Sequence, residues 1–545
     1  MQGAPLDGGA GYGFSRRSFI EKLGAVGGVS LAVAGMEALG FGFASAQAAP
    51  PVIAGGKTAK VVVLGAGLAG MTSAYELSRA GYQVEVLEAR AFAGGRCQTA
   101  RKGFVQTEVT GARQVCDLDE GLYFNTGPWR IPYHHTSTLH YTRELGVPLE
   151  ILVNDNDAAY VMMRGGLGPL ADKRLRKGEL TTDMRGYTAE LLAKTANAGA
   201  LDASMTHEDR ERFIAFLVRD GSLSPKDLSY DGAVDKGLHA QPGRRGYIVK
   251  PGAGVDPGPG TPSKPYALGD ILSSEAWRGI TNAALYEHPT TMFQPRGGMD
   301  MIAKAFERRV SKLIRYAAVV QEVRQGDRQV TVSYFDAEEK PAQVTADYCI
   351  CTIPLSVLNA IPVNVSPRFK AAMQDCSYAP VNKVGLQMKE RFWETEHGIY
   401  GGHIQTNIPG ITVISLPSTG WQGAKGVVLG AYSVVPREAV RLSSLPPSER
   451  IRYALDAGEQ VFPGAYASSF EKGYVASWHL TKYNLGGWAS WSDEGRRQSY
   501  PVLCEPDGRI YLAGEHLSYL GGWQAGAIES AWQQIAKLHA RVQQA

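Results

Sequence analysis

An arginine in an aromatic, apolar segment is the first residue of this sequence that calls for a chemical explanation. Arg130 lies in GPWRIP, residues 127–132, between Trp129 and Ile131. A planar guanidinium can donate two parallel hydrogen bonds to a carboxylate, and Pro132 restricts the backbone that follows. Two interpretations are open at this point. Arg130 binds the carboxylate of a ligand, or it pairs with an Asp or Glu for structure.

A glycine-rich turn indicates a second chemistry, the binding of a dinucleotide. Gly65, Gly67 and Gly70 form G-x-G-x-x-G after the apolar run 61–64, and a helical pattern follows. The first glycine allows a tight turn, the second lets the backbone approach a pyrophosphate, and the third lets helix and strand pack closely. Glu88 ends the next predicted strand, where a carboxylate binds ribose hydroxyls. The motif therefore favours FAD or NAD over NADP.

The elements that must position these groups are spread along the chain. Apolar strand-like segments occur near both ends, and a charge-mixed, mainly helical stretch with a Gly/Pro-rich loop occupies roughly residues 150–290. Alternating segments return after Arg296, and the chain closes with a strand and a helix. We predict an α/β fold in which a Rossmann-like domain is assembled from separated segments. A second, α+β domain with a mixed sheet and a helical insertion lies between them.

Composition excludes several classes of protein. The chain has 545 residues and a net charge of +3, and it contains no run of Lys or Arg, so we expect no nucleic-acid partner. None of the six cysteines shows metal-ligand spacing, and we predict no metal site. Cys349 and Cys351 lie in a strand-like run where both side chains face the same way, which is typical of core thiols.

The N-terminus has the pattern of a twin-arginine export signal. Arg16 and Arg17 precede a Gly/Ala-rich apolar stretch at 24–43 and an A-x-A site at 44–46. We expect residues 1–48 to direct export through the twin-arginine translocase to the periplasm or the medium. Glu37 and many glycines make the stretch a poor permanent membrane anchor.

The residues after Glu88 carry a family resemblance. Glu88-Ala89-Arg90 and Gly94-Gly95-Arg96, together with the glycine turn, resemble the flavin-containing amine oxidases. Pro295 to Asp300 and the segment from Leu512 to Ala527 are similar to two further FAD elements of that family, in family order. The resemblance implies bound FAD, with Arg96 on the pyrophosphate and the last helix directed at the flavin. The cofactor-binding residues that it implies are Gly65, Gly67, Gly70, Glu88, Ala89, Arg90, Gly95, Arg96, Gly127, Pro128, Trp129, Val323, Gly514, Glu515, Gly522, Trp523 and Ala527.

The family resemblance implies an order of domains along the chain. We expect the signal at 1–48, FAD-binding segments at 57–125, 291–365 and 496–545, a substrate and helical domain at 126–290, and a substrate-binding domain at 366–495. No cysteine lies near the turn at 484–488, where covalent members carry one, so non-covalent FAD is expected. A homodimer is expected because dimers are common among similar proteins.

GPWRIP resembles the L-amino-acid oxidase branch of the family, in which this arginine binds the substrate carboxylate. By the same resemblance Lys383 holds a water at flavin N5 for the reaction with O₂, and Arg130, Lys383 and Trp523 are the predicted catalytic residues. Trp488, Gly522 and Trp523 complete the substrate site with Arg130. One departure is that the branch's Y-Y-P tyrosine is absent, since the nearest stretch here, 414–417, reads ISLP.

The resemblance implies oxidative deamination of an L-amino acid. Hydride passes from Cα to flavin N5, the imino acid hydrolyses to a 2-oxo acid and ammonia, and O₂ becomes hydrogen peroxide. Two alternatives stay open: a related oxidase of carboxylate-free amines, and an amino-acid monooxygenase that gives an amide and CO₂. His239 and His403 are possible bases, but a neutral amine selected by pH and burial needs none.

Overall fold

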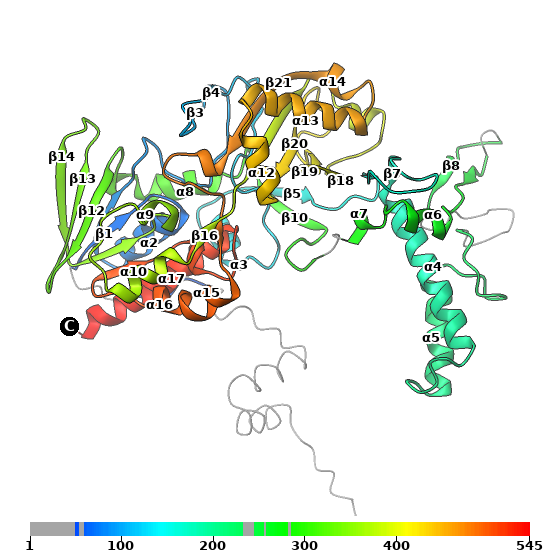
Figure 1. The fold of residues 1–545 in the computed structure, drawn as a ribbon, viewed down its shortest axis with the longest axis horizontal. Helices are drawn as coiled ribbons and strands as arrows, with labels where there is room; N and C mark the ends of the chain where they lie inside the picture. The colour runs from blue at the N-terminus through cyan, green and yellow to red at the C-terminus, as the bar shows by residue number, and fades with distance from the viewer. Residues whose placement is uncertain (1–48, 54–58, 233–244, 256–257, 282–284, 545) are drawn as a thin grey trace, which may run out of the picture. The chain divides into compact units, whose positions relative to one another are not determined.

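The computed structural model describes residues 49–53, 59–232, 245–255, 258–281 and 285–544 (Figure 1). The predicted export signal at 1–48 and the alternative base His239 lie outside the described residues.

A five-stranded parallel sheet combines segments from distant parts of the chain. Its order is β11-β2-β1-β15-β23, and each neighbouring pair is parallel. The strands are β1 (Lys60–Leu64), β2 (Gln83–Leu87), β11 (Ile314–Arg315), β15 (Tyr348–Cys351) and β23 (Ile510–Leu512). This arrangement confirms the predicted Rossmann-like sheet built from separated segments.

Both faces of this sheet are buried, because consecutive side chains of a strand point to opposite faces. Val61 and Val63 belong to a core shared with helices α2 (Leu68–Arg79), α8 (Met301–Val310) and α17 (Gln524–Gln544). Val62 and Leu64 face a second core, which also holds Cys349 and Cys351 as predicted. The run in β1 is therefore continuously apolar because both faces of the strand pack against other elements.

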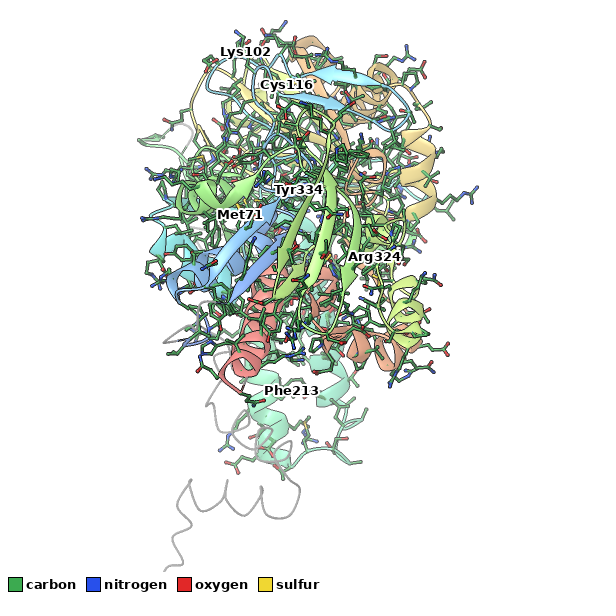
Figure 2. The ribbon with its side chains drawn as sticks, turned by 90° about the vertical axis from the view of Figure 1, so that its left-hand side faces the viewer. Met71, Lys102, Cys116, Phe213, Arg324 and Tyr334 are labelled. Atoms are coloured by element: carbon green, nitrogen blue, oxygen red, sulfur yellow. The ribbon has the colours of Figure 1, made fainter. Side chains whose placement is uncertain are left out.

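A three-stranded antiparallel sheet packs against the second face of the parallel sheet. It consists of β12 (Val319–Gln325), β13 (Val330–Phe335) and β14 (Pro341–Ala346). Figure 2 looks onto this sheet, where Tyr334 and Arg324 are labelled. Tyr334 is 3% exposed and belongs to the core, whereas the Arg324 side chain is 71% exposed. The alternation of apolar and polar residues in these strands therefore distinguishes the inner from the outer face.

A seven-stranded mixed sheet forms the second half of the architecture. Its order is β21-β17-β20-β19-β18-β6-β7, antiparallel except for the parallel β18–β6 pair. Helix α13 (Pro447–Val461) packs against it. The strands are β6 (Tyr160–Met162), β7 (Leu175–Arg176), β17 (Asn382–Met388), β18 (Gly402–Ile408), β19 (Ile411–Leu416), β20 (Gly426–Ser433) and β21 (Phe470–Ser477).

The helical insertion follows β7, as predicted. Helix α4 (Lys177–Asn197) packs along α5 (His207–Asp220), and Ala189, Ala193 and Leu217 are buried between them. Figure 1 shows α4 and α5 as a pair that extends away from the labelled sheets. In the part of the chain that the structure describes, no helix meets the length and hydropathy needed to cross a membrane.

Shorter elements complete the chain. They are α3 (Thr136–Glu144), α6 (Leu268–Ser273), α7 (Arg278–Thr281), α9 (Leu355–Leu358), α10 (Pro367–Gln374), α11 (Phe392–Thr395), α12 (Pro436–Ser443), α14 (Tyr466–Ser469), α15 (Asp493–Gln498) and α16 (Tyr500–Cys504); β3 (Val105–Thr107), β4 (Arg113–Val115), β5 (Leu149–Val153), β8 (Tyr247–Val249), β9 (Thr261–Pro262), β10 (Thr291–Pro295), β16 (Ser377–Tyr378) and β22 (Ala489–Ser490); and the 3₁₀ helices η1 (Ser311–Leu313), η2 (Trp478–Leu480) and η3 (Glu515–Leu517).

Candidate active site

A cavity of about 1020 Å³ runs from the glycine turn of the parallel sheet to the mixed sheet. It brings together residues that the sequence places up to several hundred positions apart. The predicted site residues that line it are Gly65, Gly67, Glu88, Ala89, Arg90, Gly95, Arg96, Gly127, Pro128, Trp129, Arg130, Lys383, Trp488, Gly514, Glu515, Gly522, Trp523 and Ala527.

The glycine turn has the geometry that its spacing predicts. Gly65 has φ +97°, and a Cβ there would lie 2.7 Å from Thr352 Oγ1. A Cβ at Gly70 would lie 1.9 Å from the Gly65 carbonyl oxygen, so Gly70 allows α2 to approach the turn although it does not line the cavity. Gly67 is the N-cap of α2 and provides no side-chain cap. The N-terminal N–H groups of α2 therefore retain donor capacity for an anion.

The Glu88 side chain is hydrogen-bonded to the backbone of the glycine turn. It accepts hydrogen bonds from the backbone N–H groups of Ala66, at 2.7 Å, and Arg90, at 3.0 Å. Burial raises the pKa of this carboxyl group, while the nearby Arg90 charge lowers it. The carboxylate is thus held at the end of β2, next to the cavity.

An ion pair links two of the predicted FAD motifs. Arg96 Nη1 lies 2.9 Å from Glu515 Oε2 and also donates to the Gly487 carbonyl oxygen at 2.9 Å. Glu515 Oε1 accepts from the Gly522 N–H at 2.9 Å and from the Ala489 N–H at 3.1 Å. These bonds connect the turn at Gly94-Gly95-Arg96 to the C-terminal segment beside the start of α17.

The lining fits an FAD molecule. The turn has no Cβ where a pyrophosphate would approach, α2 presents uncapped N–H groups, and Arg96 supplies a cation. The prediction for Val323 is corrected by the structure. Val323 points into the core between the two sheets, and its N–H donates to the Pro362 carbonyl oxygen at 2.9 Å. The cavity is lined a few residues earlier, by the segment from Ala318 to Gln321.

Arg130 lines the cavity, and its hydrogen-bond partners are neutral. Its Nη1 is 2.5 Å from Asn154 Oδ1 and 2.9 Å from His403 Nε2, and its guanidinium lies 4.6 Å from the centroid of the Trp129 ring. Burial lowers the pKa of Arg130 to about 10. Within the described residues no Asp or Glu forms an ion pair with it. The arginine therefore carries a positive charge that the described side chains do not neutralise.

Lys383 is a residue of β17, and its side chain lies near Arg130. Its Nζ donates to the carbonyl oxygens of Gly127, at 2.5 Å, and Asn125, at 3.4 Å. Burial lowers the pKa of Lys383 to about 7, and the Arg130 charge adds to the effect. Near neutral pH this amine is consequently divided between its charged and neutral forms.

Three residues of the site carry no motif in the sequence. Tyr432 lies opposite Lys383 in the β17–β20 register, with Lys383 Nζ 5.0 Å from its ring centroid. Burial raises the pKa of Tyr432, and the Arg130 charge opposes this. Asn154 and His403 contact Arg130, and burial holds the pKa of His403 well below its usual range. Strand pairing that brings these residues together cannot be read from local spacing.

Aromatic rings form part of the remaining wall. Trp523 contacts the His135 ring edge-on at a centroid distance of 4.8 Å, and the His288 ring at 5.7 Å. Trp488 packs beside Gly522, where a Cβ would lie 3.5 Å from its ring. The cavity thus combines apolar walls with the Arg130 cation, which has no acidic partner among the described residues, and this suits a small substrate that carries an anionic group.

Comparisons with known proteins give matches over most of the chain. Residues 68–534 match the family model of the flavin-containing amine oxidoreductases. The chain is 29% identical over 490 residues to YobN of Bacillus subtilis (strain 168), provisionally named an L-amino-acid oxidase, covering 86% of this chain and 92% of YobN. It is 26% identical over 498 residues to the L-amino-acid oxidase of Vipera ammodytes ammodytes, covering 86% and 90% of the two chains.

Solved structures share the fold at lower sequence identity. A putrescine oxidase bound to putrescine superimposes with a TM-score of 0.59 at 17% identity, covering 89% of this chain and 99% of the oxidase. Cyclohexylamine oxidase from Brevibacterium oxydans IH-35A gives 0.58 at 16% identity, covering 89% and 100%. On the match over residues 68–534, the chain belongs to the flavin-containing amine oxidoreductase family.

Proposed function

We propose that this protein is an FAD-dependent L-amino-acid oxidase that converts its substrate to a 2-oxo acid, ammonia and hydrogen peroxide. The observation that carries the proposal is Arg130. It is a buried guanidinium inside the cavity, and its partners Asn154 and His403 leave its charge uncompensated. Binding of a carboxylate would supply the missing negative charge. A substrate without an anionic group would leave this charge unpaired, which is costly in a buried site.

The glycine turn, Glu88, Arg96 and the start of α17 would hold FAD, which when bound would supply the redox chemistry between the amino acid and O₂. The protein's own contribution is orientation. Arg130 holds the carboxylate, and Asn154 and His403 hold Arg130. Because the carboxylate and the Cα–H share one carbon, fixing the first limits the positions of the second.

Tyr432 is the residue that we propose in place of the missing Y-Y-P tyrosine. Its ring lies edge-on to Trp129 at 5.7 Å, and Arg130 perturbs its pKa. Burial keeps the hydroxyl protonated at neutral pH, so it can donate a hydrogen bond to the same carboxylate. Lys383, with a pKa of about 7, can hold or release a proton at Nζ during the reaction with O₂.

An anaerobic flavin-reduction screen over the twenty L-amino acids and matched carboxylate-free amines tests this proposal. We expect L-amino acids to bleach the flavin and amines to do so poorly. Product analysis then distinguishes the alternatives: a 2-oxo acid with peroxide supports the oxidase, an amide with CO₂ indicates a monooxygenase, and an aldehyde indicates an amine oxidase. Flavin that no L-amino acid reduces would refute the proposal.

Non-covalent FAD is part of the same proposal. The described cysteine that lines the cavity is Cys97, whose Sγ lies 3.3 Å from the Met299 carbonyl oxygen and 3.1 Å from Gln524 Nε2. Burial raises the pKa of this thiol to about 12, so it is a poor nucleophile. Acid precipitation should leave all of the flavin in the supernatant, and flavin retained in the pellet would contradict the proposal.

We also propose export by the twin-arginine route, with the mature protein a homodimer in the periplasm or medium. Arg16 and Arg17 are the residues that support the first part. Replacement of both by Lys should retain the unprocessed protein in the cytoplasm in a fractionation experiment. Sedimentation of the mature protein at monomer mass would refute the dimer.

A further inference from the structure

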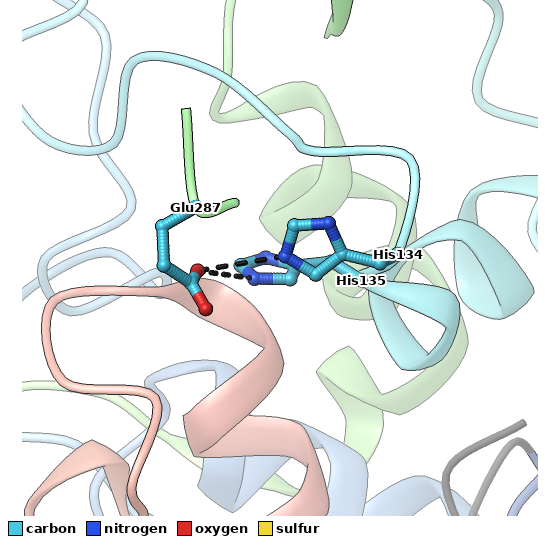
Figure 3. A group of neighbouring side chains, drawn as sticks. All are labelled: His134, His135 and Glu287. Atoms are coloured by element: carbon cyan, nitrogen blue, oxygen red, sulfur yellow. Dashed lines mark hydrogen bonds and ion pairs between the residues drawn. The ribbon is translucent and has the colours of Figure 1, made fainter. Parts of the chain in front are cut away.

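Two histidines and a glutamate meet behind the aromatic wall of the cavity (Figure 3). Nε2 of His134 lies 3.5 Å from Oε2 of Glu287, and Nε2 of His135 lies 3.3 Å from the same oxygen. The three ligand atoms lie within 4.8 Å of one another. Figure 3 shows both imidazole rings directed at the carboxylate.

Hydrogen bonding alone leaves this cluster incomplete. His135 Nε2 is hydrogen-bonded to Glu287, whereas His134 Nε2 has only the 3.5 Å contact with that carboxylate and His134 Nδ1 is buried without a hydrogen-bond partner. Buried polar atoms without a partner are uncommon, because each loses its hydration without compensation. The His134 ring is nevertheless held in place by stacking on Tyr286 at a centroid distance of 4.1 Å. A ligand that uses the His134 nitrogen would account for the arrangement.

The distances suit a transition-metal ion. Four-coordinate zinc with bonds of about 2.0–2.2 Å places neighbouring ligand atoms roughly 3.3–3.5 Å apart. The two distances to Glu287 agree with this spacing. Two imidazoles and one carboxylate favour zinc and similar metals over Mg²⁺ or Ca²⁺, which prefer all-oxygen sites.

The cluster is open to solvent through its carboxylate. The Glu287 side chain is 39% exposed, which gives an ion a route to the site and leaves room for a water.

We propose that His134, His135 and Glu287 bind Zn²⁺ or a similar divalent transition metal, with water as the fourth ligand. The site adjoins the substrate wall, because His135 contacts Trp523 and the neighbour of Glu287, His288, contacts it as well. A bound metal would tie these two chain segments together around Trp523. The prediction of no metal site rested on the spacing of the cysteines, which are not part of this cluster. No local motif indicates the cluster, because His135 and Glu287 are 152 positions apart in the sequence.

Zinc titration of the flavin-loaded, tag-free, chelator-treated protein tests this inference without any activity measurement. We expect one equivalent of Zn²⁺ to bind, and we expect His134→Ala and Glu287→Gln each to weaken binding at least tenfold. His140→Ala is the matched control, because His140 forms an ordinary i,i+4 pair with Glu144 on α3, at 2.9 Å. It should leave the affinity unchanged.

Several outcomes would refute the proposed metal site. These are the absence of saturable Zn²⁺ binding, wild-type affinity in His134→Ala or Glu287→Gln, or Mg²⁺ binding as tight as Zn²⁺ binding. Flavin content and thermal unfolding establish that each variant is folded. If His134→Ala does not fold, the partly exposed Glu287 provides the decisive variant. Loss of amino-acid oxidation with zinc binding intact would count against the proposed function alone.

Discussion

Replacement of Arg130 by Ala is the sharpest test of the substrate assignment. The change removes the cation that we expect to hold the substrate carboxylate, while Asn154 and His403 remain as neutral groups. Truncating one partner of a buried, hydrogen-bonded charge pair costs about 2–5 kcal/mol. At roughly 1.4 kcal/mol per tenfold, kcat/KM for an L-amino acid should fall about 30- to 4,000-fold.

The pH dependence of this effect also follows from the structure. The Arg130 pKa of about 10 keeps the guanidinium charged at neutral pH, so the loss in the Ala variant should be as large at pH 6 as at pH 8. Arg130→Lys keeps a charge but loses the planar fork, so its activity should lie between those of the wild type and the Ala variant.

The assay is anaerobic stopped-flow reduction of the flavin by an L-amino acid and by the amine with the same side chain. The amine should react at least as well with Arg130→Ala as with the wild type, because it has no carboxylate contact to lose. Arg278→Ala is the matched control, since Arg278 lines the cavity but is 57% exposed and pairs with Glu275 at 3.1 Å. Equal losses for amino acid and amine, or no loss for either, would refute the assignment of Arg130.

Three further predictions concern single residues of the site. Tyr432→Phe removes one hydrogen bond to a charged group, worth about 1.5–3 kcal/mol, so kcat/KM should drop for L-amino acids and not for amines; equal effects on both would exclude the proposed contact. Burial lowers the pKa of Lys383 from 10.5 to about 7, so the uncharged form is favoured on folding and the charged form costs up to roughly 5 kcal/mol below pH 7. Lys383→Met should therefore raise the free energy of unfolding most at pH 6, and the gain should shrink as pH rises towards 10; urea titrations that show a constant gain would contradict this. Arg96→Ala leaves Glu515 without its ion pair and removes the cation expected at the pyrophosphate, so the variant should lose FAD on dialysis; retention at the wild-type level would show that Arg96 does not hold the cofactor.

Local sequence determined the nucleotide-binding part because its requirements are local. The glycine turn needs residues without a Cβ at Gly65 and Gly70, and both the spacing and the flanking apolar strand are legible in ten residues. The continuous apolar run of β1 is likewise a local feature, and both faces of this strand are buried. The GPWRIP arginine was recognisable because few local roles suit a guanidinium in an apolar segment.

Tertiary structure decided which groups meet that arginine. Asn154 follows β5, whereas His403 lies on β18 and Tyr432 on β20, and only the sheet register places Tyr432 opposite Lys383. The same holds for the displacement of Val323 from the cavity, which depends on the face that β12 turns towards the core. Contacts between distant segments depend on packing and on strand pairing, and neither leaves a fixed spacing in the sequence. For that reason the sequence by itself indicated the cofactor turn and the arginine that we propose for substrate binding, whereas the charge environment of Arg130 required the fold.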